Sequence, residues 1–196
     1  MQELVREYLP QAPQHGLYLA PDIPADKLRA AIGDYAQNVE SGTVLALYDA
    51  TRLGSAKDGA LFLSDRLVYQ NNDLTPAQTI RYEDIVRVDA KRLFLGGRKV
   101  ELDVNQGRAT TTHALDFSGR PDAADFVARF LNEAMLVSAR REGDARRASS
   151  TAEAGARTPA GSDLAAVERV LTELHRAGTL AERDYRRMLD ILRGEA

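Results

Sequence analysis

From Thr43 to Phe117, apolar residues recur at every second position in short runs, and this period restricts the fold more than any other feature. In the clearest run Val100, Leu102 and Val104 alternate with charged residues. Such alternation predicts an antiparallel sheet with one buried and one solvated face. The eight runs are residues 43–48, 60–63, 67–69, 78–82, 85–88, 92–95, 99–104 and 110–117. From them we predict about seven short strands.

A single amphipathic helix is expected after the last strand. Pro121 stands at its start, and Asp122 and Asp125 in the first turn favour the positive end of a helix. Its apolar face comprises Phe126, Val127, Phe130, Leu131 and Ala134. We therefore predict an α+β fold, in which about seven antiparallel strands form a small barrel or bent sheet capped by a C-terminal helix. Apolar residues at helical spacing in 4–9 and 24–35 predict two further helices before the strands.

The composition changes at residue 140 and again at residue 162. Residues 140–161 are rich in Ala, Ser, Arg and Gly and contain no large apolar side chain, which is typical of a flexible linker. The chain thus divides into a domain over 1–139, a linker over 140–161 and a short helical hairpin over 162–196.

The predicted hairpin has apolar residues on one side of each helix. They are Leu164, Val167, Leu171 and Leu174 in the first helix, and Tyr185, Met188 and Leu192 in the second. Domains below about 40 residues usually need disulfides, metals or association to be stable. The chain has no cysteine, so we expect these residues to pack on the larger domain, on a second copy or on a partner protein.

Two motifs in the larger domain resemble bacterial pleckstrin-homology-like domains. The run from Val44 to Leu63 is similar to the start of such a domain, and Ile80-Arg81-Tyr82-Glu83-Asp84-Ile85 resembles the family's I-x-Y-x-D-I strand and bend. The resemblance covers about residues 24–137. It implies seven strands followed by a C-terminal helix, and it carries no particular chemistry.

The C-terminal segment resembles the SHOCT module, a short helical hairpin at the ends of bacterial proteins. Gly178, Leu180, Asp184 and Tyr185 match its pattern, whereas Ala181 stands where the family often has Thr. The resemblance implies oligomerisation or partner docking. It implies no enzymatic activity.

Charge and motif content favour a binding function over catalysis. The formal net charge of −3 argues against a nucleic-acid partner. Ser55 and Lys57 do not have the S-x-x-K spacing of a nucleophile pair, and no phosphate loop, cofactor motif or metal motif is present, so we expect no enzyme and no cofactor. We expect a soluble cytoplasmic protein, because no segment resembles a signal peptide or a membrane span. The favoured function is a scaffold that binds itself or another protein.

The alternative function is binding to a membrane surface or another anionic headgroup. Arg52 and Lys57 lie in the loop of the first predicted hairpin, where some pleckstrin-homology domains bind inositol phosphates. Four arginines of the linker would add to this charge, and they are Arg140, Arg141, Arg146 and Arg147.

Overall fold

A computed structural model describes the backbone of residues 1–94, 96–156, 162–176 and 180–193. Side chains are described over the same ranges except at 142, 145–156, 162–166 and 190–193. The chain forms two compact units, Met1–Asp144 and Ala145–Ala196. Each unit is described below by itself.

The first unit contains two antiparallel sheets. One has five strands in the order β1 to β5, and the other has three in the order β6 to β8. The expected barrel is wrong, because the described strands divide into two sheets that do not close on each other. The strands are β1 (Leu17–Leu19), β2 (Ala46–Asp49), β3 (Gly59–Phe62), β4 (Arg66–Gln70), β5 (Gln78–Arg81), β6 (Ile85–Arg92), β7 (Arg98–Asn105) and β8 (Thr110–Asp116).

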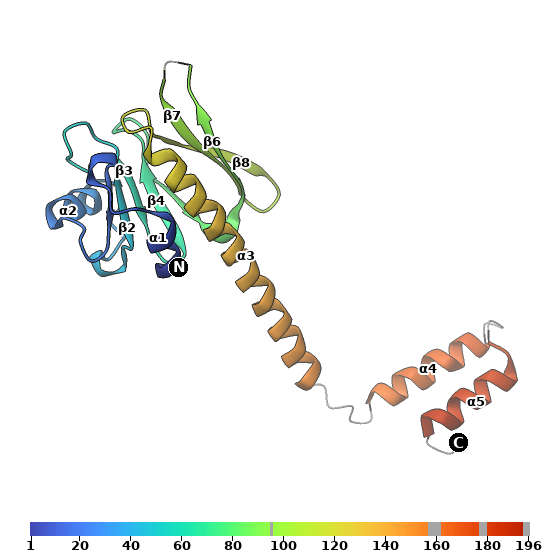
Figure 1. Cartoon of the computed structure of the whole chain (residues 1–196). Helices are drawn as coiled ribbons and strands as arrows, with labels where there is room; N and C mark the ends of the chain where they lie inside the picture. Colours follow the sequence, from blue (N-terminus) through green and yellow to red (C-terminus); the bar gives the residue numbers. More distant parts are fainter. Residues whose placement is uncertain (95, 157–161, 177–179, 194–196) are drawn as a thin grey trace. The chain divides into compact units, whose positions relative to one another are not determined.

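Helices flank the strands as the sequence predicted, except that β1 lies between the two amino-terminal helices and not after both of them. The described helices of the first unit are α1 (Gln2–Tyr8), α2 (Ala25–Asp34) and the first part of α3 (Ala123–Ala156). Figure 1 shows α2 on one side of the five-stranded sheet and α3 on the other side. Short 3-10 turns connect the elements at Pro13–His15, Ser41–Thr43 and Tyr82–Asp84.

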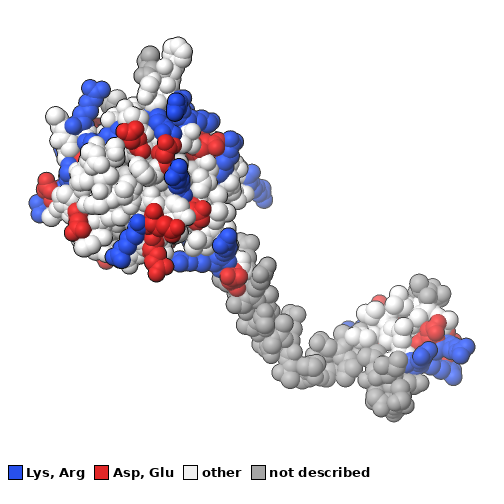
Figure 2. Space-filling view, viewed as in Figure 1, with Lys and Arg blue, Asp and Glu red and all other residues white. Residues whose placement is uncertain are grey.

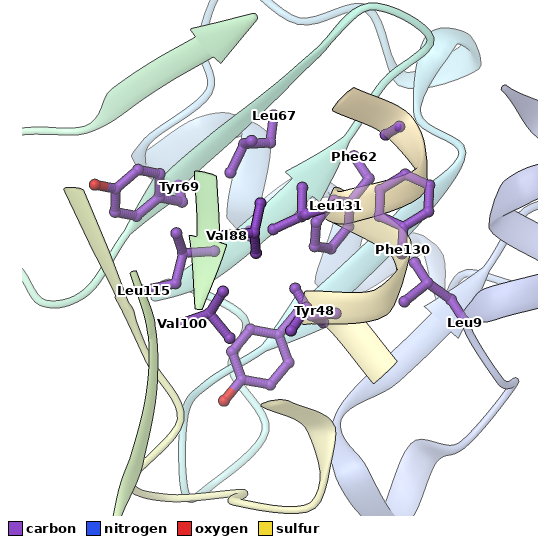
Figure 3. Close-up of a cluster of buried hydrophobic side chains, with 14 of the residues drawn as sticks. Leu9, Tyr48, Phe62, Leu67, Tyr69, Val88, Val100, Leu115, Phe130 and Leu131 are labelled. Carbon is purple, nitrogen blue, oxygen red and sulfur yellow. The ribbon is translucent and has the colours of Figure 1, made fainter. Parts of the chain in front are cut away.

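The main core lies between the two sheets and beneath α3. Phe130 of α3 packs edge-on against Phe62 and Tyr82, with ring centroids 5.5 Å and 5.8 Å away. Tyr48 of β2 stacks on Phe117 after β8 at 4.5 Å. Figure 3 shows the side chains of this cluster converging from strands of both sheets and from α1 and α3. The predicted apolar face of α3 is therefore what joins the two sheets.

A second core cluster lies under α2. Ala31 and Tyr35 of this helix pack over Leu47, Leu61 and Val68, which point away from the main core. The central strands β2 and β3 are consequently buried along their whole length. The solvated face predicted from the 99–104 run is confirmed on β7, where Val100, Leu102 and Val104 are buried and the residues between them are half-exposed.

Residues 140–156, predicted as part of a flexible linker, are helical and continue α3. Ala and Arg are strong helix formers, and they outweigh the two glycines and the serines of this segment. Residues 157–161, the remainder of the predicted linker, lie outside the described part of the chain.

The second unit contains the predicted hairpin helices, α4 (Ser162–Arg176) and α5 (Glu182–Arg193). Gly178, expected to end the first helix, lies outside the described residues. Among the helices that the structure describes, none combines the length and the apolar character that a membrane span requires.

Candidate functional site

Four loops of the first unit meet at one end of its sheets. They are 50–58 (β2–β3), 71–77 (β4–β5), 93–94 with 96–97 (β6–β7) and 117–122 (β8–α3). The first two share an end because β2 to β5 are successive antiparallel neighbours. We call this region the loop end (Figure 1).

Side-chain hydrogen bonds place the end of β8 and the β8–α3 loop at this end, and strand pairing places the β6–β7 loop beside them. The Asn71 amide donates to the carbonyl of Ala114 at 2.7 Å and accepts from the Asp116 amide at 2.9 Å. The β6–β7 turn lies beside this point, because Lys99 pairs with Asp116. Arg120 donates to the carbonyl of Thr51 at 3.3 Å, which joins the β8–α3 loop to the β2–β3 loop.

Asp49, the last residue of β2, holds the β2–β3 loop through hydrogen bonds to its carboxylate. Its carboxylate is fully buried and lies 2.7 Å from the Lys27 ammonium of α2. The other carboxylate oxygen accepts hydrogen bonds from the hydroxyl and the amide of Thr51 and from the amide of Ala56. Burial alone would lower the pKa of Lys27, but the hydrogen bond and charge of Asp49 outweigh it and raise that pKa. The carboxylate of Asp49 thus acts as a structural anchor of the loop.

Three large apolar side chains at the loop end are exposed to solvent. Leu53, Leu74 and Phe94, one in each of the first three loops, have exposed fractions of 98%, 95% and 103%. Sequence reasoning did not select them. The available signal was a large apolar residue inside a turn, as in Leu53-Gly54 and Asn72-Asp73-Leu74.

The predicted anion-binding residues lie in the same place. Arg52 and Lys57 are exposed in the β2–β3 loop and make no ion pair within the described residues, and the same holds for Arg92 at the end of β6. In Figure 2 the β6–β7 tip projects as uncharged atoms, with lysine and arginine side chains near its base. Of the linker arginines, Arg140 and Arg141 are exposed on α3, and the side chains of Arg146 and Arg147 are not described.

A polar network holds the hairpin of the second unit closed. His175 stacks on Tyr185 with ring centroids 4.7 Å apart, and its Nε2 lies 2.7 Å from a carboxylate oxygen of Glu182. The Thr172 and Tyr185 hydroxyls are 3.2 Å apart. These contacts connect α4 to α5 around Tyr185, which is half-buried.

One face of the hairpin leaves apolar side chains in solvent. Val167, Val170, Leu174 and Met188 have exposed fractions of 43%, 55%, 41% and 44%, and we call these four residues the hairpin face. Of the predicted partner-binding residues, Val167, Leu174 and Met188 belong to it, while Leu171 and Tyr185 are half-buried. Leu164 and Leu192 lie in α4 and α5, but their side chains are outside the described set.

Val170 was missed by the sequence analysis. It follows Val167 by three positions and precedes Leu174 by four, so helical spacing alone was sufficient to include it.

Titratable side chains in the described ranges form no group of three or more His, Asp or Glu placed to hold a metal ion. His113 of β8 lies with its Nδ1 3.3 Å from the Tyr69 hydroxyl, and burial raises the pKa of Tyr69 to about 12. Burial also raises the pKa of Asp58, and the carboxylates of Asp73, Asp34 and Asp49 add to the effect. These groups are spread over the unit and do not surround a common substrate position.

Comparison of the chain with protein-family models, with curated proteins and with solved structures found no match. The loop end and the hairpin face are the two surfaces of the described residues on which exposed apolar side chains gather.

Proposed function

We propose that this chain is a non-catalytic interaction protein that associates with a second copy of itself through the hairpin face. The observation that carries the proposal is the exposure of Val170, Val167, Leu174 and Met188 on a two-helix unit. Helices of 15 and 12 residues bury little apolar area against each other. Pairing the exposed faces of two hairpins makes a four-helix arrangement in which these side chains leave water.

A second copy fits the charge of this segment. Residues 162–196 contain six Lys or Arg and seven Asp or Glu, so two copies carry almost no net charge and do not repel each other. Association of this kind agrees with the SHOCT resemblance, in which the hairpin serves oligomerisation or docking.

For the first unit we propose a pleckstrin-homology-like domain that presents a rigid binding surface. Support comes from the element order, in which β2 to β5 form consecutive antiparallel pairs, β6 to β8 form a second sheet, and α3 follows. In this proposal β1, α1 and α2 are additions at the amino-terminal side.

The test is the mass of the full chain in sedimentation velocity and light scattering. Wild-type protein is expected to behave as a dimer or larger, and the chain ending at residue 161 as a monomer. Val170→Glu places a charge on the hairpin face at an exposed position, where it does not disturb folding, and we expect it to raise the dissociation constant by about tenfold or more.

Arg169→Glu is the matched control, because it introduces the same side chain one residue away on the polar side of α4. This variant is expected to keep the wild-type mass. A full-length chain that stays monomeric at all accessible concentrations would overturn the proposal, and so would a Val170→Glu variant with unchanged mass.

A further inference from the structure

We infer that the loop end is a membrane-contact surface, in which Leu53, Leu74 and Phe94 enter the interface of a lipid bilayer that contains anionic headgroups. Three fully exposed large apolar side chains, each at the tip of a separate loop and all at one end of the fold, are the starting observation. This inference is independent of self-association by the hairpin.

Each tip is held outward by hydrogen bonds of its own loop. Leu74 N donates to the Asn72 side chain at 2.9 Å, and Asn71 fastens the loop to β8. The Leu93 amide donates to the Gly97 carbonyl at 2.7 Å and closes the turn that carries Phe94. The loops are thus built to keep the apolar side chains away from the core.

The Leu53 tip is fixed in the same way by the Asp49 network. Thr51 and Ala56 on either side of it are bonded to the buried carboxylate, and Gly54 beside it takes φ +75°, which favours glycine. Since an ordered loop cannot fold Leu53 back onto the protein, the side chain becomes buried only in a binding partner.

A bilayer suits these tips better than a folded protein does. The three side chains project from different loops. None of them lines a described cavity. Those cavities are lined by α2 with residues 39–41, by β4 and β5 beside residues 35–39, and by the start of α5. A protein partner needs a separate recess for each tip, whereas lipid headgroups and acyl chains part around any convex apolar group.

Three cations without an ion pair in the described residues lie close to two of the tips, where they can contact anionic headgroups. Arg52 adjoins Leu53, Arg92 lies two residues from Phe94, and Lys57 is in the same loop as Leu53. None of these cations has an ion pair within the described residues, so all are available to phosphate or carboxylate headgroups. Asp58, Asp73 and Asp122 are the acidic residues in the same loops.

The experiment is co-sedimentation of the full chain with vesicles of phosphatidylcholine alone and of phosphatidylcholine with about 30% phosphatidylserine. We expect binding to the anionic vesicles that weakens as salt rises from about 0.05 M to 0.5 M. The triple variant Leu53→Ser/Leu74→Ser/Phe94→Ser should bind about tenfold more weakly or worse. Val86→Ser is the control, because Val86 is also exposed but lies at the start of β6, away from the loop end.

A second measurement uses the absence of tryptophan from the chain. Leu53→Trp, Leu74→Trp and Phe94→Trp each introduce a single fluorophore, whose emission should shift to shorter wavelength with anionic vesicles, whereas Val86→Trp should not shift. Failure of wild-type protein to pellet at low salt, equal binding by the triple serine variant, or unshifted emission at all three tips overturns the inference. Because hairpin variants leave the loop end intact, loss of self-association and loss of vesicle binding are separate results.

Discussion

At the scale of single residues, Asp49 shows how one buried carboxylate positions a functional loop. Its anchoring of Thr51 and Ala56 was predictable, since Asp and Thr at loop starts commonly bond nearby amides. Its ion pair with Lys27 was not, because 22 residues separate the two in sequence and only the packing of α2 brings them together.

Removing the cation tests the importance of this pair. Lys27→Met leaves the carboxylate of Asp49 buried without compensation, and we expect the free energy of unfolding to fall by about 3 kcal/mol. Urea denaturation measures the change. The control is Lys57→Met. Lys57 lies in the β2–β3 loop, is exposed and has no ion pair within the described residues, so this variant should change the free energy of unfolding by less than about 0.5 kcal/mol. Equal midpoints for the two variants would show that the buried pair contributes nothing.

Exposure of individual side chains was the least predictable property at this scale. Alternation identifies which residues of a strand share a face, but turn residues have no period. Leu53, Leu74 and Phe94 are therefore visible as unpartnered only once the loops are folded, and so is the half-buried position of Leu171 and Tyr185 in the hairpin.

At the scale of elements, the period of the sequence located most strands and helices. It missed β1, whose three residues are too few to show a period. It also ended β6 at residue 88, four residues early, and predicted a separate strand over 92–95, where Leu93 and Phe94 belong to the β6–β7 turn. Neither division into two sheets nor burial of β2 and β3 on both faces follows from alternation, because both depend on where α2 and α3 pack.

An ion-paired glutamate on the solvated face of the three-stranded sheet should make the stability of the fold depend on pH. Glu101 of β7 accepts hydrogen bonds from Lys91 of β6 and from Lys99, and these bonds lower the pKa of Glu101 to about 2. Because this folded-state pKa is below the ordinary value of 4.5, the interaction stabilises the fold above about pH 4.5. Its contribution disappears as the pH falls from there toward 2.

Glu101→Gln removes that contribution at every pH. We expect the urea midpoint of the wild type to exceed that of Glu101→Gln at pH 7, and the difference to shrink steadily below pH 4.5. Glu40→Gln, at an exposed position with no ion pair in the described ranges, serves as the control. A difference that stays constant from pH 7 to the acid range would contradict the argument.

At the scale of the whole molecule, both core clusters draw their buried residues only from positions 5–134. Stability therefore belongs to the first unit, while the hairpin face supplies association and the loop end supplies membrane contact in our proposals. Because each chain has both a hairpin face and a loop end, a dimer formed through the hairpin faces has two loop ends. If both bind the same bilayer, the dimer binds more tightly than a monomer does, without any new contact.

The chain ending at residue 144 tests this division. All core residues of the main cluster up to Ala134 remain in it, so we expect a single cooperative unfolding transition with a free energy within about 1 kcal/mol of the main transition of the full chain. The same fragment should be monomeric and should bind anionic vesicles more weakly than the full chain, because it has one loop end per particle. Loss of cooperative unfolding in the fragment would mean that the core depends on residues beyond 144. Vesicle binding equal to that of the full chain would mean that self-association and membrane contact do not reinforce each other.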